Sequence, residues 1–120
     1  MHLLSSILIA FVALEHFYIL WIEMFAWTTV GKKTFRSFPA DLFEKTKLLA
    51  ANQGLYNGFL AAGLIWSLFI MNREWSRNIA CFFLSCVLVA GVYGGITTSK
   101  SIFYKQGVPA ILALLVTVFS

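Results

Sequence analysis

Residues 3–27 read LLSSILIAFVALEHFYILWIEMFAW, an apolar run interrupted only by a few polar side chains. At about 1.5 Å per residue, a helix of this length is longer than the roughly 30 Å of hydrocarbon in a bilayer. No basic segment precedes the run and charged residues lie inside it, so we expect a mature helix and not a cleaved signal peptide. The presence of Glu15, His16 and Glu23 within it needs a physical explanation.

The composition of the whole chain is that of a membrane protein. Of its 120 residues, 60% are hydrophobic and 12% are charged, whereas about 25% charged residues is usual in a soluble domain. Helices are the expected spanning form, because no series of short alternating strands is present for a barrel. The sequence therefore predicts an all-α membrane protein. We expect residues 1–120 to form a single domain, an antiparallel four-helix transmembrane bundle with spans at approximately 3–27, 48–71, 78–98 and 102–119.

Basic residues are distributed unevenly among the three predicted connections. Seven of the nine fall in the first and third connections, and two fall in the second. The positive-inside rule therefore predicts a multi-pass protein of the cell membrane, with loops 28–47 and 99–106 in the cytoplasm and both termini outside. The net charge of +4 follows from this asymmetry, so we expect the lipid bilayer as a partner and not nucleic acid.

The long first connection predicts further structure at the membrane surface. The sequence Pro39-Ala40-Asp41 is a helix-start signal, with Asp41 as the expected N-cap and Glu44 three residues later. Aromatic residues near the predicted ends of the spans are expected to anchor the chain at the membrane surface: Trp27, Phe35, Phe38, Phe43 and Trp75.

The polar residues of the first span share one side of the helix. On a helical wheel Ser5, His16 and Glu23 fall on one stripe, and Glu15 lies at its edge. An ionised carboxylate near the bilayer centre costs several kcal/mol, so such groups usually face the interior of a bundle. We therefore expect this stripe to face a neighbouring helix.

The second span begins LAANQGLYNGF at residues 49–59, with two polar pairs four residues apart. These pairs, Asn52 with Tyr56 and Gln53 with Asn57, lie side by side on one face. Antiparallel docking on the first span places Glu23 level with Asn52 and Gln53. The same docking places His16 level with Asn57. Because amides can donate to a carboxylate, a polar ladder between the two helices is predicted.

The third and fourth spans supply small residues and a polar rim. A face of Gly91, Gly94, Gly95 and Thr98 permits close approach of another helix, and we expect a homo-oligomer. Together the spans predict a polar cleft that opens toward the cytoplasm and binds a small polar or amphipathic ligand. Its predicted lining is Glu15, His16, Glu23, Asn52, Gln53, Tyr56, Asn57, Tyr93 and Gln106.

Several functions fit such a cleft. His16 can exchange protons near neutral pH, which favours a proton relay as well as ligand binding. One alternative is a membrane enzyme on a lipophilic substrate, with His16 and Glu23 as an acid–base pair. A second alternative is a structural or accessory bundle without a ligand, because interhelical hydrogen bonds contribute about 0.6–2 kcal/mol each.

No cofactor is expected from the motifs. One histidine with carboxylates does not give three inward metal ligands at a fixed spacing, so no metal site is predicted. The sequence also has no phosphate loop and no nucleophile elbow. Cys81 and Cys86 are five residues apart on different helix faces, and we expect them to be unbridged small apolar side chains.

Four sequence blocks cover much of the chain: ALEHFYILWIEMFAW (13–27), LAANQGLYNGFLAAGLIW (49–66), GVYGGITTSK (91–100) and QGVPAILALL (106–115). In these blocks the chain resembles a family of small bacterial membrane proteins that is catalogued as domain of unknown function 1304. The resemblance implies a four-span membrane protein and no established activity. Lys105 departs from it, because an apolar residue is expected at that position.

Overall fold

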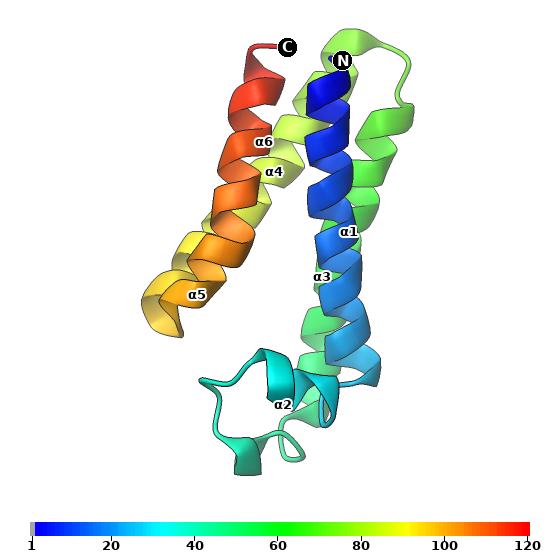
Figure 1. The fold of residues 1–120 in the computed structure, drawn as a ribbon. Coiled ribbons are helices and arrows are strands. Elements are labelled where there is room, and N and C mark those ends of the chain that lie inside the picture. Colours follow the sequence, from blue (N-terminus) through cyan, green and yellow to red (C-terminus); the bar gives the residue numbers. More distant parts are fainter. Residues whose placement is uncertain (1) are drawn as a thin grey trace. The chain divides into compact units, whose positions relative to one another are not determined.

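The structure is a computed structural model that describes residues 2–120. Every regular element in this range is a helix, which confirms the predicted all-α class for the described residues (Figure 1). The elements are α1 (Leu3–Phe25), α2 (Val30–Thr34), η1 (Ala40–Leu42), α3 (Lys47–Phe69), α4 (Arg73–Thr97), α5 (Lys100–Ile102), η2 (Phe103–Gly107) and α6 (Val108–Val118).

Three helices in the described part of the chain are long and apolar enough to cross a membrane. They are α1, α4 and the continuous helix Lys100–Val118, which combines α5, η2 and α6. Helix α3 has 23 residues but is not among them, because polar residues such as Asn52, Gln53 and Asn57 occupy its first half. A fourth span therefore stays a prediction.

Helix α4 begins five residues before its predicted start at Asn78. The preceding Asn72 is extended, and its side-chain oxygen accepts a hydrogen bond from the Trp75 N–H at 3.0 Å. This is an N-cap, and Glu74 in the first turn suits the positive end of the helix dipole. The apolar pattern alone misses this polar first turn.

The predicted loop 99–106 is wrong over most of its length. Only Thr98 and Ser99 connect α4 to the next helix, which begins at Lys100. The Ser99 hydroxyl accepts a hydrogen bond from the Ser101 N–H at 3.2 Å, and this cap starts the helix inside the predicted loop.

The last helix widens into a π-helical turn at η2. There the Val108 N–H bonds to the carbonyl of Phe103, five residues earlier. Pro109 follows at once, and proline cannot donate to the carbonyl four residues before it and would clash with that carbonyl in an α-helix. The wider turn gives the chain a geometry that accommodates the proline ring.

Contacts divide the chain into two compact units. The first consists of the residues up to Leu14 together with Leu60–Ser120, and the second is Glu15–Phe59. Helices α1 and α3 each contribute one half to each unit. The prediction of a single domain stays a prediction.

The first unit has an apolar core and a close contact between two backbones. In Figure 1, α4 lies beside α5 and α6. A Cβ on Gly91 would lie 2.8 Å from the backbone nitrogen of Gly107, so the close helix approach predicted for this glycine is confirmed. The buried core comprises Ile9, Val12, Ala13, Leu64, Ala80, Leu84, Val87, Ala110 and Ala113.

In the second unit, the aromatic residues of the first connection pack on one another. The ring centroid of Trp27 lies 4.7–5.8 Å from those of Phe35, Phe38 and Phe43, and Phe43 is only 1% exposed. The Trp27 indole N–H donates to Thr46 Oγ at 3.0 Å. The four predicted anchors of this connection therefore form an aromatic cluster, whereas Trp75 of the first unit is exposed.

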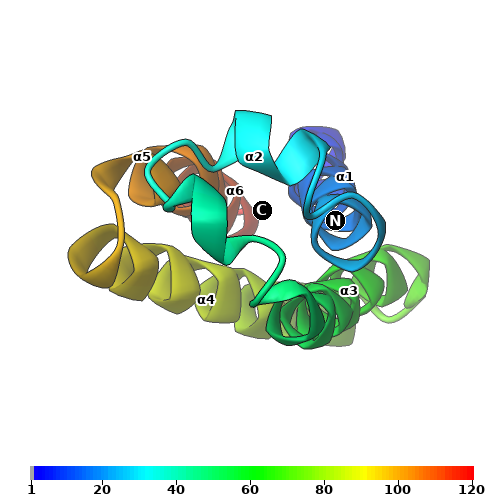
Figure 2. The same cartoon turned by 90° about the horizontal axis from the view of Figure 1, so that it is seen from below.

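The helical turns of this connection differ from their prediction. Figure 2 shows α2, which the sequence does not predict, beside the end of α1. The expected N-cap at Asp41 is wrong, because Pro39 precedes the single turn of η1 and no side chain caps it. With only three residues, Ala40–Leu42, this turn is shorter than the expected surface helix.

Candidate functional site

A carboxyl–amide hydrogen bond joins α1 to α3 within the second unit. Asn57 Nδ2 donates to Glu23 Oε1 at 2.6 Å. The Glu23 side chain is 6% exposed, and over residues 2–120 no lysine or arginine forms an ion pair with it. A neutral amide is therefore the group that donates a hydrogen bond to this buried carboxyl.

Small residues of α3 bring the two helices together at this point. A Cβ on Gly54 would lie 2.8 Å from Met24 Cγ and 3.2 Å from the Leu20 carbonyl oxygen, and one on Gly58 would meet the Leu20 side chain. The order of these contacts shows that the two segments run antiparallel, as predicted. This close approach lets the short Asn57 side chain reach α1.

The register between the helices differs from the predicted one. Antiparallel docking is predicted to place Glu23 level with Asn52 and Gln53, but in the structure Glu23 binds Asn57, more than one helical turn further along α3. The physical reason is that the glycine side of α3 packs on α1. Asn52 lies outside that side, is exposed, and donates to the Leu48 carbonyl of its own helix at 3.2 Å.

The predicted burial of the polar stripe on α1 is confirmed. His16 is fully buried two turns before Glu23, about 10 Å along the helix axis. Glu15 is half-buried, and its Oε1 is enclosed without a hydrogen bond from the described residues. His16 and Glu23 therefore lie on the buried side of the first span, and Glu15 is partly enclosed.

The remaining predicted site residues lie elsewhere. Gln53 and Tyr56 are exposed, so the structure does not bring them or Asn52 to the Glu23–Asn57 contact. Tyr93 is exposed and Gln106 is half-buried, and both belong to the first unit. The ligand-binding role of these residues stays a prediction.

Gly54 and Gly58 are the residues of this contact that the sequence interpretation misses. They form a G-x-x-x-G pattern, which is typical of closely packed membrane helices. In LAANQGLYNGF the two glycines alternate with amide residues, and the predicted polar ladder rests on those amides alone. The pattern predicts which side of α3 packs on another helix.

Hydrogen bonding and proton exchange are the chemistry that the groups at this contact can supply. A carboxyl group can hold a proton and still accept a hydrogen bond from an amide. Within residues 2–120, no three His, Cys, Asp or Glu side chains gather closely enough to hold a metal ion. Cys81 and Cys86, in the other unit, are free thiols.

Comparisons with known proteins identify one family model and one relative. The family model "Protein of unknown function (DUF1304)" matches residues 10–118. The chain is similar to the uncharacterized protein YpaA of Lactococcus lactis subsp. lactis (strain IL1403), with 37% identity over 123 residues that cover 99% of this chain and 100% of that protein. No solved structure matches the chain. The chain therefore belongs to the DUF1304 family of proteins of unknown function.

Proposed function

We propose that this chain is a four-span antiparallel membrane protein that exchanges protons at a polar site formed by Glu23, Asn57 and His16. The observation that carries the proposal is the 2.6 Å hydrogen bond from a neutral amide to a carboxyl that is 6% exposed. Protons enter from the cytoplasm at Glu23 and leave at the opposite membrane surface after passing His16. Because His16 lies about 10 Å deeper along the helix axis, water molecules carry the proton between the two groups.

The geometry supports a proton better than a larger guest at this contact. Asn57 bonds directly to Glu23, and the helices touch at Gly54, so the two polar side chains are not held apart around an empty space. An amide N–H can donate to a carboxyl group in both of its protonation states. The contact therefore persists while the proton comes and goes.

The proposed topology places this site near the cytoplasmic surface. Helix α3 is the fourth span, since its 23 residues reach about 35 Å, enough for a bilayer core. The basic first connection and the turn at Thr98–Ser99 face the cytoplasm, and both termini lie outside. Glu23 is two residues from the end of α1 at Phe25, which is its cytoplasmic end in this topology.

Proton flux into vesicles tests the proposal. The purified protein is reconstituted with a trapped pH indicator, and the decay of an imposed pH gradient is compared for wild type, Glu23→Gln and Asn52→Leu. Glutamine keeps an oxygen that accepts from Asn57 but has no carboxyl proton to exchange. We expect Glu23→Gln to decay as slowly as empty vesicles and Asn52→Leu to match wild type. A folded Glu23→Gln protein with wild-type flux would overturn the proposal.

A structural role is the second candidate, and the close packing at Gly54 and Gly58 favours it. In this case the Glu23–Asn57 bond holds α1 to α3 and no proton moves. Wild-type vesicles would then show the flux of empty vesicles, while Asn57→Leu would still lower the free energy of unfolding. The flux and stability measurements together separate the two candidates.

A further inference from the structure

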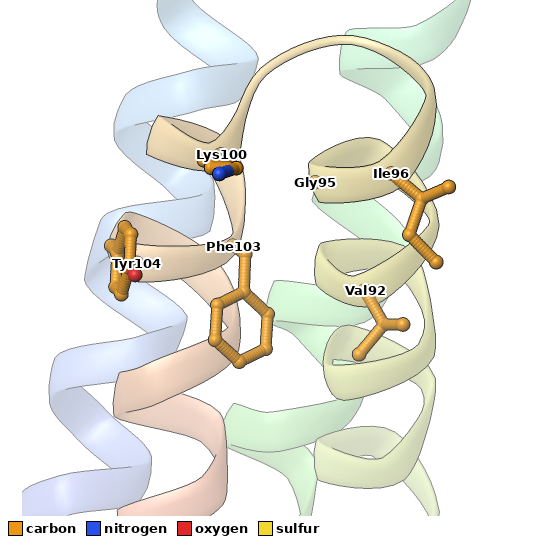
Figure 3. Close-up of a pocket in the computed structure, with 6 residues that line it drawn as sticks. All are labelled: Val92, Gly95, Ile96, Lys100, Phe103 and Tyr104. Atoms are coloured by element: carbon orange, nitrogen blue, oxygen red, sulfur yellow. The ribbon is translucent and has the colours of Figure 1, made fainter.

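A groove lies on the first unit where the end of α4 meets α5 and η2 (Figure 3). Its volume is about 460 Å³, within the range of small-molecule sites. It belongs wholly to one unit and shares no residue with the Glu23–Asn57 contact. The residues that line it are Val92, Gly95, Ile96, Lys100, Phe103 and Tyr104.

The groove has apolar walls and a polar side. Val92 and Ile96 project from α4, and the Phe103 ring extends from η2 toward α4 (Figure 3). The polar groups, the Lys100 amine and the Tyr104 hydroxyl, both come from the opposite segment, α5 and η2. A ligand that fits this arrangement has a hydrocarbon part and a hydrogen-bonding head.

The charge around the groove selects the sign of that head. The last acidic residue in the sequence is Glu74, so residues 75–120 contain no carboxylate side chain to oppose Lys100. Lys100 is exposed, and over the described residues it forms no ion pair. A cation that is free of an acidic partner, next to apolar walls, is complementary to an anionic amphiphile.

The position of the groove identifies the amphiphile. Lys100 is the first residue of the membrane-length helix Lys100–Val118, and Ile96 is next to the last residue of α4. The groove therefore lies at the ends of two candidate spans, where lipid headgroups meet acyl chains. Basic pockets between spanning helices are known to bind anionic headgroups.

We propose that this groove binds one anionic phospholipid. Its phosphate interacts with the Lys100 amine and the Tyr104 hydroxyl, and an acyl chain lies on Val92, Ile96 and Phe103. Gly95 contributes by letting the helices approach, since a Cβ there would lie 2.7 Å from Phe103 Cβ. The site is separate from the proton site and does not depend on which leaflet faces the cytoplasm.

Native mass spectrometry of the full chain tests this site. Delipidated protein is titrated with phosphatidylglycerol or phosphatidylcholine of the same acyl chains. We expect one phosphatidylglycerol to bind ahead of phosphatidylcholine, and Lys100→Gln to weaken that binding roughly fivefold. The matched control is Lys105→Gln, an exposed lysine of the same segment that does not line the groove; it should stay within about twofold of wild type.

Further variants and a competing anion test the same lipid site. Ile96→Ser removes part of the apolar wall and should weaken binding of both lipids, because its effect does not depend on the headgroup. Equal losses for Lys100→Gln and Lys105→Gln would show a general surface charge effect and overturn the site. Full displacement of the lipid by inorganic phosphate would reveal an anion site without an acyl chain. In a background where Cys81 and Cys86 are replaced by alanine, disulfide-linked dimers of Ile96→Cys without lipid selectivity would assign the groove to a second copy of the chain.

Discussion

At the Glu23–Asn57 contact, a single hydrogen bond both links two helices and satisfies a buried carboxyl group. A bond between polar side chains of membrane helices contributes about 0.6–2 kcal/mol. Leaving one partner buried and unbonded costs about 1–3 kcal/mol. Because Glu23 is almost fully buried and bonded by a neutral amide, it depends on Asn57 more than an exposed carboxylate would.

The first prediction compares two asparagines of α3. Asn57→Leu removes the donor to Glu23 and should lower the free energy of unfolding by about 1–3 kcal/mol. Asn52→Leu is the control, because Asn52 is exposed and bonds only its own helix; its effect should stay within about 0.5 kcal/mol. Denaturation in detergent by circular dichroism measures both, and equal effects would contradict the assigned contact.

At the residue scale, burial on α1 is predictable and the pairing partner is not. In a 23-residue apolar helix, Glu15, His16 and Glu23 must turn from lipid, and the spacing of His16 and Glu23 places those two on one side. The partner of Glu23 depends on the depth at which α3 docks. Gly54 and Gly58 determine that depth through backbone approach, which a count of polar residues does not report.

At the element scale, the glycines differ in whether they contact a side chain or the backbone of the neighbouring helix. A Cβ on Gly58 would meet Leu20 Cδ1, the end of a flexible side chain. A Cβ on Gly91 would lie 2.8 Å from the nitrogen and 3.0 Å from the Cα of Gly107. Side chains can change rotamer, whereas helix backbones move only as units. An added methyl group is therefore tolerated less well at Gly91 than at Gly58.

The second prediction follows from this difference. Gly91→Ala should lower the free energy of unfolding by about 1–3 kcal/mol, because α4 and η2 must separate. Gly58→Ala should change it by about 1 kcal/mol or less, since the better helix propensity of alanine offsets the movement of Leu20. Thermal unfolding of the two variants under one detergent condition measures the order, and the reverse order would refute the backbone contact.

Helix ends and the π-helical turn mark the limit of prediction for elements. Apolar runs locate α1 and the last helix to within two residues at each end, but the start of α4, five residues before its predicted position, depends on the Asn72 cap. The widened turn before Pro109 arises from backbone hydrogen bonding, and no side-chain periodicity encodes it.

At the scale of the whole molecule, the asymmetry of basic residues is the sequence feature that predicts the membrane topology. Three helices of the described chain are suited to cross a membrane, and α3 is less apolar because its first half holds the amides. The long apolar runs, without short alternating strands, are sufficient to predict the all-α class. The same pattern does not predict how the spans are arranged. Polar side chains lower the hydropathy of a helix such as α3, even where those side chains pack against another helix and do not face lipid.

The third prediction tests the orientation of the chain. In a background where Cys81 and Cys86 are replaced by alanine, single cysteines are placed at two exposed positions. Met71→Cys, between α3 and α4, should react with a membrane-impermeant maleimide in intact cells. Ser37→Cys, in the basic first connection, should react only after lysis. The opposite pattern would invert the topology and place Glu23 near the outer surface.

The central claim is that Glu23 exchanges a proton while Asn57 remains bonded to it, and infrared difference spectroscopy tests this claim most directly. Spectra of the reconstituted protein are recorded across a pH titration for wild type and Glu23→Gln. We predict a carboxyl C=O band in wild type that changes with pH, shifts in frequency in Asn57→Leu and is absent in Glu23→Gln. A wild-type difference spectrum that Glu23→Gln reproduces would contradict the account.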